Sequence, residues 1–276
     1  MIQKFSYHTH TNFSDGRNSL EEMLEQAVKL GFEEIGISDH FIVHKGFPQS
    51  PSLNLLQDYH APHIYRVDFE KAVKDFKAHY EHIHTVANKY PLKIYVGAEV
   101  DYFDYDGWKE GFEYFKSECR PDYCLSGNHF LFLPDGRIID PRDLSLAGSI
   151  KEQKKVVSNH YKMLCKAIAS GLFDFIAHID YMRRVEKNLN EDFRQDKENV
   201  VECLAKHNIP TELSTKGLRK ENPDYYPAVW LADLLIEKNI PIVISDDAHQ
   251  ISELGSQFDK AESYLQSRNY TNRWKL

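Results

Sequence analysis

The feature that most constrains the fold is an alternation of short apolar runs with amphipathic stretches of helical period along the whole chain. The apolar runs are short and rich in Ile, Val, Tyr, Phe and Leu, as buried strands are. Seven such strand–helix units predict a single α/β fold, a parallel barrel with helices outside it. The predicted strands are residues 4–7, 34–38, 93–97, 123–126, 173–177, 210–213 and 241–245.

The clearest predicted helix covers residues 19–30. Ser19 can serve as its N-cap with Glu22 three residues further on, which is the spacing of a capping box. An apolar stripe follows, and Gly31 ends the helix. The other predicted helices are 67–90, 150–170, 192–207, 225–238 and 257–267.

Length and charge limit the domain number and the partners. The 276 residues suit one large domain, and no linker or repeat divides them, so we expect a single domain over residues 1–276. The 34 basic and 42 acidic residues give a net charge of −8, which disfavours long nucleic acids and anionic membranes as partners. A small phosphorylated molecule remains compatible with a local basic pocket. The sequence predicts no oligomeric state.

The cellular compartment is predicted from apolar runs and cysteines. No apolar run reaches the roughly 18 residues that span a bilayer, and the N-terminal segment turns polar too early for a secretory signal. The cysteines form no CxxC pair, which favours structural thiols in a reducing cytoplasm. They are Cys119, Cys124, Cys165 and Cys203.

Histidines and carboxylates follow six of the seven predicted strands. The carboxyl ends of the strands of a parallel barrel meet at one face, so we expect these side chains to share a cleft. In chain order they are His8, His10 and Asp15; Asp39 and His40; Glu99 and Asp101; His129; His178 and Asp180; and Asp246, Asp247 and His249.

These residue types are ligands for Zn²⁺, Mn²⁺ or Fe²⁺. Side chains two residues apart on a strand point to the same side, so His8 and His10 can grip one ion, and Asp247 and His249 have the same spacing. Glu99 can bridge two ions, and the number of ligands predicts two or three ions in one cleft. A strand-end Asp or His could instead cap the next helix, but capping does not explain the placement after six strands.

Eight further histidines have other expected positions. We expect three of them on the polar face of the helix 67–90, namely His79, His82 and His84. Two are expected at the surface of other helices, His160 and His207. The last three lie in a long loop that could line the pocket mouth, His44, His60 and His63.

Four motifs occur in a fixed order: HTHTNFSDG with SDH, then GAEVDY, then the His of SGNHF and AHID, then SDDAH. This ordered set resembles the PHP (polymerase and histidinol phosphatase) family over essentially the whole chain. The resemblance implies a distorted seven-stranded, TIM-like barrel with a trinuclear metal site at the carboxyl ends of the strands. It implies three ligand sets: His8, His10, Glu99 and Asp247; Glu99, His129 and His178; and Asp15, His40 and His249.

Within that family the chain is most similar to stand-alone histidinol-phosphatases. The similarity lies in the segment from Ser214 to Lys220, in the Tyr226–Pro227 pair, and in the long loop at 41–66. Many histidinol-phosphatases have a His where Asp15 stands here. The resemblance implies hydrolysis of L-histidinol phosphate to L-histidinol and phosphate in histidine biosynthesis.

The mechanism that we expect is attack on phosphorus by a hydroxide that bridges two ions, held by Glu99, His129, His178 and Asp247. A guanidinium matches phosphate with two parallel hydrogen bonds, which favours arginine over Lys216 for the phosphate. The expected phosphate ligands are Arg219 first, then Arg183 and Arg184. The expected contacts to the imidazole and ammonium of the substrate are Asp101, Tyr102 and Asp180, and Asp180 could equally orient a metal-bound histidine.

Three other functions stay open. The protein could be another PHP phosphoesterase that acts on nucleotides, short oligonucleotides or phosphotyrosine. It could be a metal-dependent amidohydrolase on a similar barrel, or a metal-binding barrel without catalysis. A serine hydrolase or a P-loop nucleotide-binding protein is disfavoured, because the chain has neither GxSxG nor GxxxxGK[ST]. The sequence does not identify the native metal.

Overall fold

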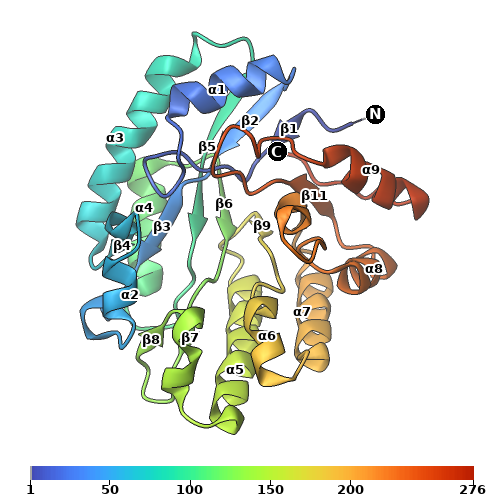
Figure 1. The fold of residues 1–276 in the computed structure, drawn as a ribbon. Helices are drawn as coiled ribbons and strands as arrows, with labels where there is room; N and C mark the ends of the chain where they lie inside the picture. Colours follow the sequence, from blue (N-terminus) through green and yellow to red (C-terminus); the bar gives the residue numbers. More distant parts are fainter. Residues whose placement is uncertain (1) are drawn as a thin grey trace.

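The computed structural model describes residues 2–276, and its centre is a nearly closed barrel of seven parallel strands. The chain just beyond the first and last of these strands forms one parallel bridge, between Thr9 and Ala248. This arrangement confirms the predicted barrel (Figure 1). In spatial order the strands are β1 (Phe5–Ser6), β2 (Glu34–Ile37), β5 (Lys93–Val100), β6 (Tyr123–Ser126), β9 (Phe175–Ile176), β10 (Thr211–Ser214) and β11 (Ile242–Ser245).

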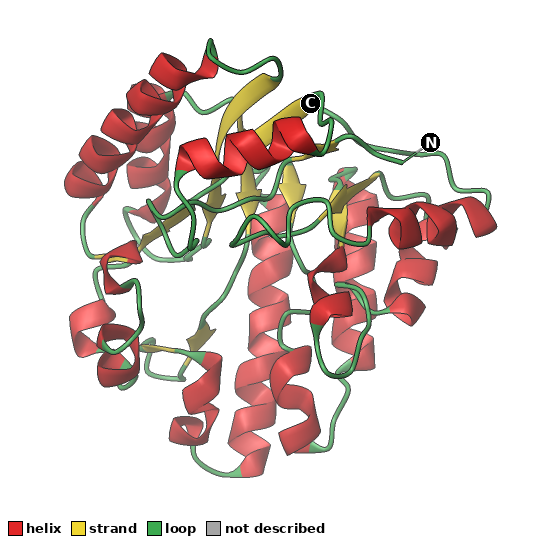
Figure 2. Ribbon diagram, turned by 45° about the horizontal axis from the view of Figure 1, so that its top comes forward, coloured by secondary structure: helices red, strands yellow, loops and turns green. Residues whose placement is uncertain are grey.

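Helices surround the strands (Figure 2). The predicted capping box is present, since the Ser19 side chain accepts from the Glu22 backbone and the Glu22 side chain accepts from the Ser19 backbone. The six predicted helices form with small shifts of their ends. They are α1 (Leu20–Lys29), α3 (Phe69–Ala87), α5 (Ile150–Ala169), α7 (Arg194–His207), α8 (Val229–Glu237) and α9 (Phe258–Ser267).

One helix of the outer layer, α4 (Trp108–Cys119), was not among the predicted elements. It begins at Gly107 in the left-handed conformation instead of at a capping side chain, and it contains a second glycine, Gly111. A Cβ atom at Gly111 would lie 2.3 Å from the ring of Phe69. Both glycines weaken the helical pattern, and the second one lets α3 and α4 pack closely.

Two insertions build a wall beside the carboxyl end of the barrel. The segment 44–68 carries η1 (Phe47–Gln49), α2 (Leu53–Gln57), η2 (Pro62–Ile64) and β4 (Tyr65–Arg66), and β4 pairs with β3 (His40–Val43). The other insertion is the hairpin of β7 (Leu131–Phe132) and β8 (Ile138–Ile139), followed by η3 (Pro141–Ala147). Ser50 Oγ donates to the carbonyl of Ile138 over 2.7 Å and ties the two together. The shorter elements α6 (Arg183–Leu189) and η4 (Thr215–Arg219) follow β9 and β10.

An aromatic cluster, here called the aromatic plug, is the smaller of two buried apolar cores. Glycine makes room for it, because a Cβ atom at Gly97 would lie 2.3 Å from Cζ of Tyr123. The Tyr123 hydroxyl donates to the carbonyl of Tyr7 over 2.7 Å. The buried members of the plug are Tyr7, Tyr95, Tyr123, Leu125, Phe175, Ala177 and Val243.

Two helix histidines contradict the predicted surface positions. His79 is buried, with Nε2 2.9 Å from Asp39 Oδ2 and its ring stacked on Phe13. His160 is also buried, Nδ1 lies 3.2 Å from the Phe130 carbonyl, and burial lowers the pKa of His160 to about 4. Each ring can lie on the core-facing side of its helix because a buried oxygen there accepts a hydrogen bond from one of its nitrogens. The remaining helix histidines are exposed, as predicted: His82, His84 and His207.

None of the helices within residues 2–276 is both long enough and apolar enough to pass through a membrane.

Candidate metal centre

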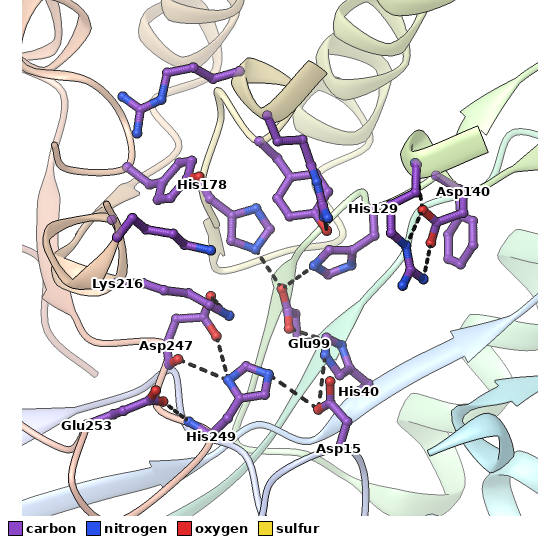
Figure 3. Close-up of a pocket in the computed structure, with 18 of the residues that line it drawn as sticks. Asp15, His40, Glu99, His129, Asp140, His178, Lys216, Asp247, His249 and Glu253 are labelled. Carbon is purple, nitrogen blue, oxygen red and sulfur yellow. Dashed lines mark hydrogen bonds and ion pairs between the residues drawn. The ribbon is translucent and has the colours of Figure 1, made fainter. Parts of the chain in front are cut away.

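The structure brings the nine predicted ligands together at the carboxyl end of the barrel. Figure 3 shows those that line the adjoining cavity. The strand ends explain why, because each side chain lies in or just after a strand of the same parallel sheet or in the loop that follows it. His8 and His10 follow β1, Glu99 lies in β5, and Asp247 follows β11. The others are Asp15, His40, His129, His178 and His249.

The carboxylate of Glu99 is the centre of the cluster. It is buried, and both of its oxygens face imidazole nitrogens. Its Oε2 faces three rings and its Oε1 faces two. Figure 3 shows His40, His129 and His178 around this carboxylate. The separations run from 3.0 Å to 3.3 Å, to His8, His10, His40, His129 and His178.

Two further carboxylates complete the cluster. Asp247 Oδ1 lies 3.6 Å from His8 Nε2 and 3.4 Å from His10 Nε2. Asp15 Oδ1 lies 3.4 Å from Nε2 of both His40 and His249. The backbone of Asp247 is left-handed, with φ of 46°. A non-glycine residue in this conformation stores strain of the kind that functional sites contain.

Many polar atoms of the cluster are buried and have no hydrogen-bond partner among the described residues. Such atoms cost stability unless another group satisfies them, and a set of them that face one another fits divalent cations. Imidazole and carboxylate donors without thiolate suit Zn²⁺, Mn²⁺ or Fe²⁺. The atoms are Nε2 of His8, both ring nitrogens of His10, Nδ1 of His40 and His178, Oε2 of Glu99 and Oδ1 of Asp247.

The donor atoms fall into four overlapping groups, each within 4.8 Å. Asp15, His40 and His249 stay together, as the family resemblance implies, and His10 joins them. The other residues are divided differently from the implied sets, so the assignment of ligands to single ions stays a prediction. The other three groups are His8, Glu99 and His178; His8, His10 and Asp247; and His40, Glu99 and His129.

A carboxylate outside the nine ligands, Glu212, supports the cluster from behind, and the sequence did not predict this role. Its Oε2 lies 2.8 Å from His8 Nδ1, and its Oε1 accepts from the backbone of His178 over 2.8 Å. This contact turns His8 so that Nε2 faces Glu99. The signal in the sequence was an acid inside the sixth strand, the strand whose end carried no predicted ligand.

Asp101 has the same supporting role for another ring. Its Oδ2 lies 2.8 Å from His129 Nδ1, and its Oδ1 accepts from the His129 backbone. It is buried and does not line the cavity, contrary to its expected contact with substrate. Gly127 leaves the space that this geometry needs, since a Cβ atom there would lie 2.4 Å from both Glu99 Oε1 and His129 Cε1.

The charges of the cluster shift its pKa values strongly. Burial opposes the charged form of His8, but nearby carboxylates, Asp247 foremost, hold its pKa well above the ordinary value. The same balance raises the pKa of His10 to about 9. Burial raises the pKa of Asp247, but Lys216 and His8 outweigh it and hold that pKa well below the usual range. A cation that binds here must therefore displace protons from imidazoles.

The cluster opens into a cavity of about 1170 Å³. Lys216, which the sequence reasoning ranked below the arginines, lines this cavity, and its Nζ lies 2.8 Å from Asp247 Oδ2. Aromatic side chains line part of the wall, with Tyr59 and Tyr65 supplied by the segment 44–68. The other basic residues of the lining are Arg142, Arg183, Arg184 and Lys220.

The structure separates the arginines that were expected to bind phosphate. Arg183 lines the cavity, and its guanidinium contacts Asp224 and the Tyr225 carbonyl. Arg184 also lines it and donates to the Tyr181 hydroxyl.

Arg219 lies outside the cavity lining. Its Nη2 donates to the carbonyl of Asp246 over 2.8 Å and is 3.7 Å from Glu253. The partners of the two side chains differ, since Arg219 donates to the backbone of Asp246 whereas Lys216 contacts the carboxylate of Asp247.

The remaining predicted contacts lie apart from the cavity. Asp180 is buried and accepts from the Ala228 backbone over 2.9 Å, so it neither lines the cavity nor orients His178. Tyr102 packs against Trp108. The three loop histidines do not line the cavity either: His44 lies among aromatic rings, and His60 and His63 contact backbone carbonyls.

Comparison with known families decides the membership of the chain. The PHP domain model matches residues 6–216. The chain belongs to the PHP domain family. The histidinol-phosphatase of Bacillus subtilis is 23% identical over 280 residues, which cover 94% of this chain and 98% of that protein.

Two solved structures share the fold. A protein from Listeria monocytogenes, named as a histidinol phosphatase, aligns with a TM-score of 0.72 at 21% identity over 93% of this chain and 99% of its own. Histidinol phosphate phosphatase from Lactococcus lactis, in complex with Zn, L-histidinol and phosphate, aligns with a TM-score of 0.68 at 17% identity over 98% of this chain and 95% of its own.

Proposed function

We propose that this protein is a divalent-metal-dependent phosphomonoesterase whose substrate is L-histidinol phosphate. The observation that carries the proposal is the ring of five imidazoles around Glu99, which opens into a cavity with basic side chains. The choice of substrate rests on the relatives, because the Bacillus subtilis protein has this name and the Lactococcus lactis structure holds L-histidinol and phosphate. The products are L-histidinol and phosphate, a step of histidine biosynthesis in the cytoplasm.

The cofactors in this proposal are two or three divalent ions, Zn²⁺, Mn²⁺ or Fe²⁺, held by the nine clustered side chains. Such ions polarise phosphoryl oxygens and make water a usable nucleophile near neutral pH. Glu212 and Asp101 hold two of the ligand rings in place from behind. We also propose one domain over residues 1–276, since both ends of the chain contribute strands to the same barrel.

The basic residues of the cavity bind the phosphate in this proposal. Lys216 lies against Asp247 and therefore next to the cluster. Arg183 and Arg184 supply guanidinium groups to the same cavity. Their positive charge offsets the charge of the non-bridging oxygens, which favours binding of the phosphate and of the transition state.

The experiment that tests the function compares substrates and metals. Metal-free protein should hydrolyse nothing, and added Mn²⁺ or Zn²⁺ should restore hydrolysis. In a panel of L-histidinol phosphate, a nucleoside bisphosphate and a phosphotyrosyl peptide, kcat/KM should be highest for L-histidinol phosphate. Full activity in the presence of a strong chelator would refute the metal requirement, and a higher kcat/KM for another phosphoester would refute the substrate.

A matched pair of variants tests the phosphate site. Lys216→Met should raise KM and weaken inhibition by inorganic phosphate, by about tenfold if one charged hydrogen bond of 1.5 kcal/mol or so is lost. Arg219→Met is the control, because Arg219 lies outside the cavity lining. Equal effects of both variants on KM would show that the cavity geometry does not identify the phosphate contacts.

A further inference from the structure

The loop that carries Asp15 is held from two sides. On one side, Asp39 accepts hydrogen bonds from the backbone and side chain of Thr11 and from Ser14 Oγ. On the other side, the segment 44–68 reaches over the loop. His60 Nε2 lies 3.0 Å from the carbonyl of Asp15, and the Tyr59 hydroxyl donates to its side chain over 2.8 Å. The segment therefore contacts the side chain of Asp15 directly, and its Arg66 also donates to the backbone carbonyl of His40.

The two oxygens of Asp15 have different surroundings. Oδ1 faces the cluster, where His40 Nε2 and His249 Nε2 each lie 3.4 Å away (Figure 3). Oδ2 accepts the hydrogen bond from Tyr59. A carboxylate with one oxygen engaged by a phenol offers the other oxygen to a cation and is prevented from turning. Asp15 is nearly fully buried, so water does not readily replace the phenol.

Tyr59 belongs to the cavity as well as to the loop. Its ring lines the cavity, lies 5.9 Å from the ring of Tyr65, and has the Arg142 guanidinium 5.8 Å from its centre. Asp140 fixes that guanidinium with two hydrogen bonds of 2.8 Å. The ring is thus packed in one orientation, and this orientation aims the hydroxyl at Asp15.

We infer that Tyr59 is a positioning residue for the cation that His10, Asp15, His40 and His249 would hold, and that it acts by restricting Asp15 to one coordinating oxygen. The inference rests on the proposed metal-dependent function. It separates this group from the others, because the supporting contacts of His8 and His129 come from Glu212 in β10 and from Asp101 just after β5. The segment 44–68 then tunes the affinity of this metal position through the side chain of Asp15.

The experiment is a metal titration of the wild-type protein and four variants that were first stripped of metal. Tyr59→Phe removes the hydroxyl and keeps the ring. Tyr65→Phe is the matched control, since Tyr65 lines the same cavity and has no hydrogen bond to a cluster residue among the described contacts. Asp15→Asn marks which binding step belongs to the Asp15 group, and Tyr59→Phe in the Asp15→Asn background completes a double-mutant cycle.

Calorimetric titration with Mn²⁺ should show one step weakened by roughly 10- to 100-fold in Tyr59→Phe, the range seen when a supporting partner of a ligand is removed. It should be the step that Asp15→Asn also weakens. The double variant should bind Mn²⁺ in this step with the same affinity as Asp15→Asn alone. Turnover of Tyr59→Phe should recover when the Mn²⁺ concentration is raised. The Mn²⁺ electron paramagnetic resonance spectrum should change for that site and stay constant in Tyr65→Phe.

The outcomes separate this inference from the proposed function. If the wild-type protein binds no metal, the function itself is wrong. If it binds metal and hydrolyses phosphoesters, while Tyr59→Phe and Tyr65→Phe titrate alike, only the role of Tyr59 is overturned. Weakening of every step in Tyr59→Phe, or a matching loss of thermal stability in the metal-free state, also overturns it, since either result indicates a general structural role.

Discussion

The aromatic plug and the metal cluster are built by the same strands, and they differ in almost every physical property. In β5, Tyr95 belongs to the plug and Glu99, four residues further on, is the centre of the cluster. Phe175 and His178 repeat this division at β9, and Val243 and Asp247 repeat it at β11. The plug consists of apolar side chains in contact with one another, whereas the cluster consists of buried polar atoms of which many are unpaired.

One barrel thus separates the side chains that stabilise the fold from those that would bind metal. Packing of large apolar groups stabilises the fold whether or not a ligand is present. Buried polar atoms without partners destabilise it, and they persist where the rest of the structure holds them in place. Each strand passes from the plug into the cluster. A substitution in the plug should therefore affect stability, and one near the carboxyl end of the strand should affect metal binding.

The largest expected effect belongs to His178→Ala. The imidazole lies 3.0 Å from Glu99 and its Nδ1 is unpaired among the described residues, so its loss removes a ligand and little packing. We expect kcat/KM to fall by at least about a thousandfold, since metal-assisted hydrolysis depends on an intact ligand set. Thermal unfolding of the metal-free variant should match that of the metal-free wild type. Retention of a tenth of the activity would contradict the assignment of the chemistry to the cluster.

Phe175→Ala, three residues earlier, should have the opposite effect. Phe175 is fully buried in the plug, and a Phe-to-Ala change in a core lowers the free energy of unfolding by about 3 to 5 kcal/mol. Urea unfolding of metal-free protein measures this loss. The folded fraction should bind Mn²⁺ with wild-type affinity. Weakened metal binding at unchanged stability would show that plug and cluster are not separate.

The barrel and the cluster ligands followed from the sequence for a local reason. Short apolar strands leave little freedom in where they end, and residues such as His10 and Asp247 lie within four residues of those ends. Each of the nine predicted ligands therefore came to the same face of the barrel. Whether each binds an ion stays a prediction.

What the sequence did not reveal depends on contacts between distant segments. Glu212 looked like an ordinary strand residue until β10 placed it behind His8. Lys216 and Arg219 differ in their partners, the carboxylate of Asp247 and the backbone of Asp246, which lie far from both along the chain. Tyr59 lies in an insertion whose path over Asp15 has no local signature. His79 looked polar and exposed because its acceptor, Asp39, lies 40 residues earlier in the chain.

Glu212→Gln tests the supporting contacts that lie just behind the ligands. Gln can still accept from the His178 backbone, but its NH₂ group would then face His8 Nδ1 and favour the tautomer with the proton on Nε2. Metal affinity should drop about 10- to 100-fold, with little change in the urea midpoint. Glu262→Gln is the matched control, because Glu262 is a buried partner of Arg273. Similar metal affinities for both variants would remove Glu212 from the site.

The last prediction is a pH dependence of metal binding that the cluster should show and the plug should not. In the metal-free protein the pKa of His10 is raised to about 9, and the pKa values of His8 and His129 are also raised. These rings therefore carry protons at pH 7, and a cation must displace them. The metal affinity should rise with pH up to about 9, by about tenfold per pH unit for each proton released.

The same pKa shifts set the direction in which the stability of the metal-free protein changes with pH. A ring whose folded pKa exceeds its unfolded value of about 6.5 contributes stability below that pH and loses it as the pH rises toward the folded pKa. Metal-free protein should thus lose stability between about pH 6.5 and 9. The difference in stability between the metal-loaded and the metal-free protein should grow over the same range. Calorimetry at pH 7.5 in two buffers of different ionisation enthalpy counts the released protons. A count of zero would mean that the imidazoles are neutral before the metal arrives, and that the carboxylates around them do not control their charge.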